Sequence, residues 1–137
     1  MEQKDYFLRE VEKIGVALRY ILKGFLGNKE NLAIRIENDF EQTNEQLLNE
    51  IGFDLQHFIT LDEPAFQEYI SKFDGINTTN LELLAELIFQ TGINEKSDKK
   101  KILLIKALQL FELCNKTDKT YSFERTNKIE TVINALK

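Results

Sequence analysis

The sequence predicts an all-α protein of five to six helices, with antiparallel helical hairpins packed as a bundle or as a tetratricopeptide-like array. Apolar residues recur at intervals of three and four along most of the 137 residues, and this spacing places them on one face of a helix. Residue types that begin or end helices stand between these stretches. No useful length of chain alternates with a period of two, so we expect no strands.

The first predicted helix runs from Asp5 to Phe25 and is the clearest. Such a helix gains most of its stability from packing its apolar face, so the rest of the chain must cover it. Gly15 lies within it and predicts a close crossing by another helix, with a kink or a ligand contact as the alternative. The predicted inward residues follow a three-four rhythm: Phe7, Val11, Ile14, Leu18, Ile21 and Phe25.

A second helix is predicted from about Lys29 to Glu50, with Gly52 as its stop signal. The turn at Gly27 and Asn28 joins it to the first helix, so residues 1–52 form a predicted antiparallel hairpin. Its predicted inward residues are Ala33, Ile36, Phe40, Thr43 and Leu47.

Shorter helices are predicted in residues 53–137. Asp54 caps a short helical turn through His57, and Asp62 caps the next helix, with Pro64 near its first turn. Thr78 or Thr79 caps a helix that reaches about Gly92. Further helices cover about 98–115 and 122–136. Their predicted inward residues are Ala65, Phe66, Tyr69, Ile70 and Phe73, then Leu81, Leu84, Leu87 and Ile88, then Leu104, Ala107, Leu108, Phe111 and Cys114, and finally Ile129, Val132, Ile133 and Leu136.

Length and composition predict a single domain over residues 1–137. The lone Cys114 excludes an intrachain disulfide and fits a reducing compartment. No apolar run approaches the roughly 20 residues of a membrane helix, and the N-terminus lacks the layout of a signal peptide. We therefore expect a cytoplasmic protein with no membrane partner.

The net charge of −5 is unevenly distributed. Residues 30–63 carry nine acidic groups and one basic group, Arg35. A net negative chain is repelled by phosphate backbones, so nucleic acid is disfavoured as a partner. The run from Lys99 to Lys101 stands near a predicted helix start, where the helix dipole disfavours cations. This run is interpreted as a solvated surface, with a patch that faces an anion or an acidic partner as the alternative.

Two stretches resemble known families. The segment Leu84-Ala85-Glu86-Leu87 with Gly92, followed by residues 107–111, resembles the helix pair of a tetratricopeptide repeat at about 78–115. The opening residues 5–12, Asp-Tyr-Phe-Leu-Arg-Glu-Val-Glu, resemble the first helix of an uncharacterised bacterial all-helical family. The second resemblance implies a fold and no activity. The first implies a concave surface that binds peptides or partner proteins.

Few residues are available for catalysis. The single His57 and the single Cys114 cannot build a zinc site of the Cys/His kind within one chain. Cys114 is interpreted as a core residue. Asp54 and His57 have the spacing of a helical metal motif, but a di-iron centre needs two such motifs. We therefore expect no enzymatic activity and no cofactor.

The surface of the first helix offers the best candidate site. Tyr6, Arg9, Lys13 and Tyr20 lie off its apolar face and are of types common in protein interfaces. Leu8, Val16 and Ala17 add apolar area, which indicates either a central helix or an interface. The expected function is a non-enzymatic protein–protein interaction or scaffolding module that binds a protein or peptide, including a second copy of the chain. The alternative is a small-ligand- or metal-binding bundle, with possible enzymatic activity, that gathers Glu37, Asp39, Glu41, Asp54 and His57.

Overall fold

The protein is described by a computed structural model that covers residues 2–27, 40–118 and 122–137. This part of the chain holds seven helices and no strand, which confirms the all-α prediction. The number exceeds the five to six helices that were predicted. The seven are α1 (Glu2–Gly27), α2 (Phe40–Ile51), α3 (Leu55–Phe58), α4 (Glu63–Ser71), α5 (Thr78–Asn94), α6 (Lys99–Thr117) and α7 (Phe123–Leu136).

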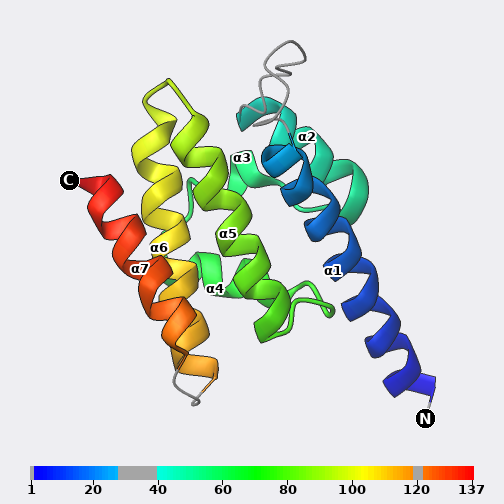
Figure 1. Cartoon of the computed structure of the whole chain (residues 1–137). Coiled ribbons are helices and arrows are strands. Elements are labelled where there is room, and N and C mark those ends of the chain that lie inside the picture. The colour runs from blue at the N-terminus through cyan, green and yellow to red at the C-terminus, as the bar shows by residue number, and fades with distance from the viewer. Residues whose placement is uncertain (1, 28–39, 119–121) are drawn as a thin grey trace.

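Four of the helices follow one another across the molecule in the order α1, α5, α6, α7 (Figure 1). Helices α5 and α6 form the most extensively packed pair, an antiparallel hairpin closed by the short connection 95–98. Helix α2 packs on α1 and α3 on α2. Buried apolar residues from α1 to α7 form one contiguous cluster. Each described helix contributes to this cluster and is stabilised by burying apolar surface there.

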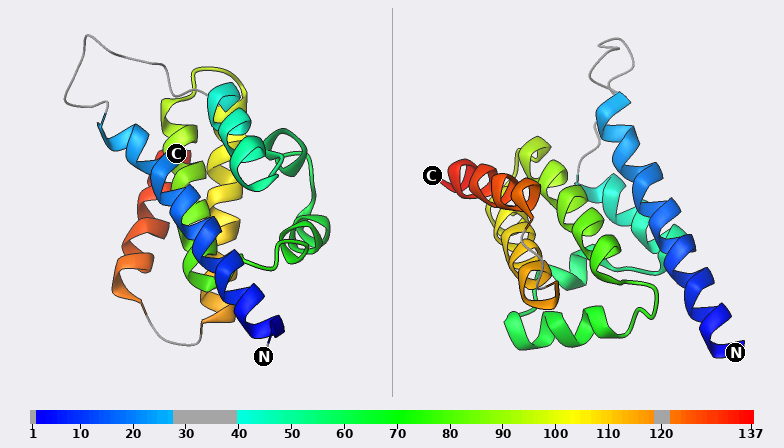
Figure 2. Two further views of the ribbon diagram at one scale, coloured as in Figure 1. Left: turned by 90° about the vertical axis from the view of Figure 1, so that its right-hand side faces the viewer. Right: turned by 60° about the horizontal axis from the view of Figure 1, so that its bottom comes forward.

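Helix α1 follows the predicted rhythm over only part of its length. Ile14, Leu18, Ile21 and Phe25 are buried. Phe7 is 46% exposed, so the prediction that it faces the core is wrong. Phe7 is exposed because no other helix covers this part of α1. The first two turns extend past the neighbouring helices, and the N-terminal end of α1 projects from the molecule (Figures 1 and 2).

The cover over α1 begins at Val11, where a buried asparagine from α5 fixes the helix. The side-chain amide of Asn80 donates to the carbonyl oxygens of Val11 at 2.8 Å and Gly75 at 2.7 Å. A Cβ on Gly15 would lie 2.9 Å from Oδ1 of Asn80. The glycine therefore permits the close crossing that the sequence predicted.

The helix caps decide most of the boundaries. The predicted caps Asp54 and Asp62 accept hydrogen bonds from the backbone N–H groups of residues 57 and 65, each at 3.1 Å. The prediction that Thr78 or Thr79 caps α5 is wrong, because Asn77 holds that position and accepts from the N–H of residue 80 at 2.9 Å. Asparagine is among the most favourable N-cap residues, which explains why the helix begins one residue earlier than predicted.

Helix α2 is described only from Phe40 onward. The predicted start at Lys29, together with Ala33 and Ile36, lies outside the described residues. Phe40, Thr43 and Leu47 are buried as predicted. Gly52 ends the helix with a φ of +73°, a conformation that glycine adopts without strain.

One further prediction about the core is wrong, and one buried residue was not predicted. Ile133 in α7 is 40% exposed, so the prediction that it faces the core is wrong. Lys106 was not expected inside, yet it is buried in α6. Cys114 is fully buried, as predicted.

Candidate interaction surface

A row of five residues runs along the side of α1 that faces away from the other helices. Their spacing of three, four, three and four keeps them on one face of the helix. Tyr6, Val16 and Tyr20 are 57%, 55% and 68% exposed. Arg9 and Lys13 stand between them and are also exposed. We call Tyr6, Arg9, Lys13, Val16 and Tyr20 the outer stripe; it spans about 21 Å at 1.5 Å per residue.

The outer stripe contains all four residues that the sequence indicated as an interaction surface. Val16 joins them, whereas Ala17, which was also considered for this surface, is buried. Aromatic residues and arginine are enriched at the energetic centres of protein interfaces. Exposed large apolar residues cost little singly, but a continuous row of them on one helix is typical of a binding surface.

The projecting turns of α1 enlarge this surface. Phe7 and Leu8 are 46% and 53% exposed and lie beside Tyr6 at the N-terminal end. Three consecutive large apolar side chains are therefore in water. In the part of the chain that the structure describes, Arg9 and Lys13 take part in no ion pair.

The acidic residues of the alternative prediction do not form a binding site among the described residues. The Asp54 carboxylate caps α3, and His57 is exposed with its ring centre 5.5 Å from the ring centre of Tyr69. Glu41 is exposed on α2, and positions 37 and 39 lie outside the described residues. Within residues 2–27, 40–118 and 122–137, no three His, Cys, Asp or Glu side chains cluster as metal ligands would.

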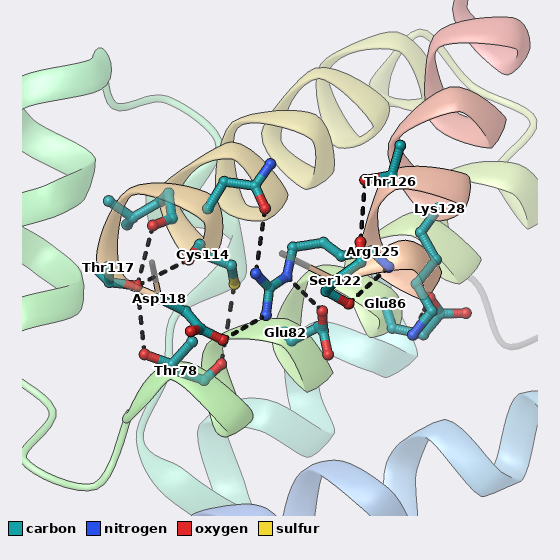
Figure 3. A network of polar contacts seen from close by, with 12 residues as sticks. Thr78, Glu82, Glu86, Cys114, Thr117, Asp118, Ser122, Arg125, Thr126 and Lys128 are labelled. Carbon is teal, nitrogen blue, oxygen red and sulfur yellow. Dashed lines mark hydrogen bonds and ion pairs between the residues drawn. The ribbon is translucent and has the colours of Figure 1, made fainter. Parts of the chain in front are cut away.

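The main polar network of the molecule lies at the opposite side, around the buried Arg125 of α7 (Figure 3). Its guanidinium donates to Glu82 of α5 at 2.7 Å, to Asn115 of α6 at 3.2 Å and to Asp118 at 3.4 Å. The guanidinium of Arg125 thus binds one group of α5 and two groups at the C-terminal end of α6, so the network fixes α7 against the α5–α6 hairpin. All three nitrogens of the guanidinium donate to groups of the fold, which is typical of a structural role.

Cys114 lies next to this network and is buried. Its thiol donates a weak hydrogen bond to the carbonyl oxygen of Thr78 at 3.9 Å. Burial raises the pKa of the thiol to about 12, and the nearby Arg125 only partly offsets that effect. Since the thiolate is the reactive form, a thiol that stays protonated at neutral pH is a poor nucleophile.

Lys106 of α6 is also buried. Its ammonium donates to the carbonyl oxygen of Leu61 and lies 5.3 Å from the ring centre of Phe66. Burial lowers the pKa of this amine, opposed by the carboxylates of Asp62 and Glu63. The contacts join α6 to the start of α4, so the lysine has a structural role there. The lysines at positions 99–101, which the sequence analysis singled out, lie at the start of α6, where the Lys99 ammonium is 4.7 Å from the Phe40 ring centre.

Comparison with models of protein families, with curated proteins and with solved structures found no match. Among the helices that the structure describes, none combines the length and the apolar character needed to cross a bilayer.

Proposed function

We propose that the protein is a non-enzymatic helical interaction module that binds a protein partner through the outer stripe of α1. The observation that carries the proposal is the exposure of Tyr6, Val16 and Tyr20 on one helix face, with Arg9 and Lys13 between them and in no ion pair with the residues that the structure describes. Tyrosine and arginine supply large contact area and hydrogen-bond donors at low entropic cost. Binding of this kind needs no catalytic group, and we propose the bacterial cytoplasm as its place.

The two family resemblances belong to the same proposal. The α5–α6 hairpin has the antiparallel arrangement of a tetratricopeptide helix pair, and close packing of Gly92 against Leu103 and Leu104 supports it. In this proposal the α5–α6 hairpin holds α1 in place through the packing of α1 on α5. The partner binds α1 rather than a concave surface of the hairpin, because the exposed apolar side chains are concentrated on α1.

The test is affinity capture of the tagged full-length chain from its native cell, comparing two double variants. Tyr6→Ser with Tyr20→Ser removes the aromatic ends of the outer stripe. Glu112→Ser with Lys116→Ser changes two exposed residues of α6 as a matched control. We expect the tyrosine variant to lose the co-purifying protein, including an untagged copy of this chain, while the control retains it. Retention by both variants would overturn the proposal.

A further inference from the structure

A second surface of the molecule complements the outer stripe in charge and in apolar character. Helix α2 exposes Glu41, Glu45 and Leu48, which lie on one side of the helix at intervals of four and three. We call these three residues the acidic face. Leu48 is 42% exposed, and neither glutamate forms an ion pair within the described residues.

The spacing of the charges matches between the two surfaces. Arg9 and Lys13 are four residues apart on α1, and Glu41 and Glu45 are four residues apart on α2. Each separation corresponds to about 6 Å along a helix, so both cations can meet both carboxylates at once. Leu48 then meets Val16 if the two helices run parallel and Tyr6 if they run antiparallel.

The two surfaces cannot meet within one molecule, because α1 and α2 already pack against each other through their inner faces. They lie at the same edge of the protein, on the side away from α7 (Figure 1). Pairing α1 with its own copy would bring Arg9 and Lys13 against a second pair of cations. Like charges in direct opposition disfavour that arrangement.

Resting on the proposed function, we infer that the partner is a second copy of this chain, with the outer stripe of α1 on the acidic face of the partner's α2. Because each copy carries both surfaces, a two-fold axis forms the contact twice. The dimer then contains four opposite-charge pairs and covers the stripe of both copies.

The test is sedimentation velocity of the full-length protein with charge-reversal variants. The first variant is Arg9→Glu with Lys13→Glu, and the second is Glu41→Lys with Glu45→Lys. All four residues are exposed, so circular dichroism should show an unchanged fold. We expect each variant alone to dimerise at least about tenfold more weakly, since reversal replaces attractions with repulsions. Raising the salt from about 0.1 M to about 1 M should weaken the wild-type dimer, because screening shortens to about 3 Å.

The mixture of the two variants is the decisive sample, because every charge pair between unlike copies is attractive again. We expect a heterodimer of near wild-type affinity. Lys100→Glu with Lys101→Glu is the control of equal charge change on an exposed part of α6, and it should dimerise like the wild type. A monomeric wild type at about 100 μM, well above the affinity of a weak specific dimer, would overturn the inference, as would a mixture that stays dissociated or a control that weakens equally.

The two proposals fail separately. If the wild type is monomeric but the Tyr6 and Tyr20 variant still loses a co-purifying protein, the outer stripe binds another protein and only the self-pairing is overturned. If neither result appears, both proposals are overturned.

Discussion

Replacing Glu82 is predicted to destabilise the protein more than replacing Arg125, the residue with which it pairs. The Arg125 side chain is 5% exposed, whereas those of Glu82 and Asp118 are 29% and 36% exposed. Glu82→Leu leaves a buried guanidinium without its closest counter-charge. Loss of a partner from a buried pair costs about 3–5 kcal/mol, and the partial exposure of Glu82 reduces this to about 3 kcal/mol. Arg125→Met removes the buried charge and leaves two carboxylates that still reach water, for about 1–2 kcal/mol.

Thermal unfolding followed by circular dichroism measures the difference. A loss of about 3 kcal/mol lowers the Tm by about 10 °C in a domain of this size. The double variant should be little less stable than Arg125→Met alone, because the second substitution then removes no buried pair. A larger loss for Arg125→Met than for Glu82→Leu, or additive losses, would refute the argument that desolvation of the guanidinium dominates.

Three further predictions concern stability and reactivity. Gly75→Ala should lower the free energy of unfolding by more than about 2 kcal/mol, because the added Cβ would collide with a backbone carbonyl oxygen of α1. At Gly52 an added Cβ meets no atom, so Gly52→Ala should cost only about 1 kcal/mol, for the positive φ. Chemical denaturation of both variants measures this difference. Leu18→Ala should lose about 2–5 kcal/mol from the core, whereas Tyr20→Ala should change stability by less than about 0.5 kcal/mol; equal losses would place Tyr20 in the core. Burial raises the pKa of Cys114 to about 12, so a thiol reagent at pH 8 should label the native protein on the order of a hundredfold more slowly than the denatured protein; comparable rates would show an accessible thiol.

The helices were predictable because apolar spacing and cap residues are local signals. Ile14, Leu18, Ile21 and Phe25 are buried because the three-four rhythm puts them on one face of α1. Phe7 obeys the same rhythm and is exposed, because the sequence does not record where the neighbouring helices end. Asn77 could have been predicted as the cap in place of Thr78, since asparagine is the more favourable N-cap residue and stands directly before the two threonines.

The outer stripe was largely predictable, and the buried polar residues were not. Tyr6, Arg9, Lys13 and Tyr20 were indicated because amphipathic residue types stood off the apolar face of α1. Arg125 stands among polar residues near the start of α7, so the local sequence predicts that it is exposed to solvent. It is buried because Glu82 of α5 and Asp118 at the end of α6 both pair with it, and no pattern within a single helix predicts a contact between three helices.

Site-specific photocrosslinking in the native cell tests the central claim most directly. A photoreactive phenylalanine derivative is introduced at Tyr20 of the outer stripe and, in a separate sample, at the exposed Glu68 of α4. We predict a protein adduct from position 20, abolished by the Arg9→Glu and Lys13→Glu substitutions, and no adduct from position 68. Equal adducts from both positions, or none from position 20, would contradict the claim that the outer face of α1 binds a protein.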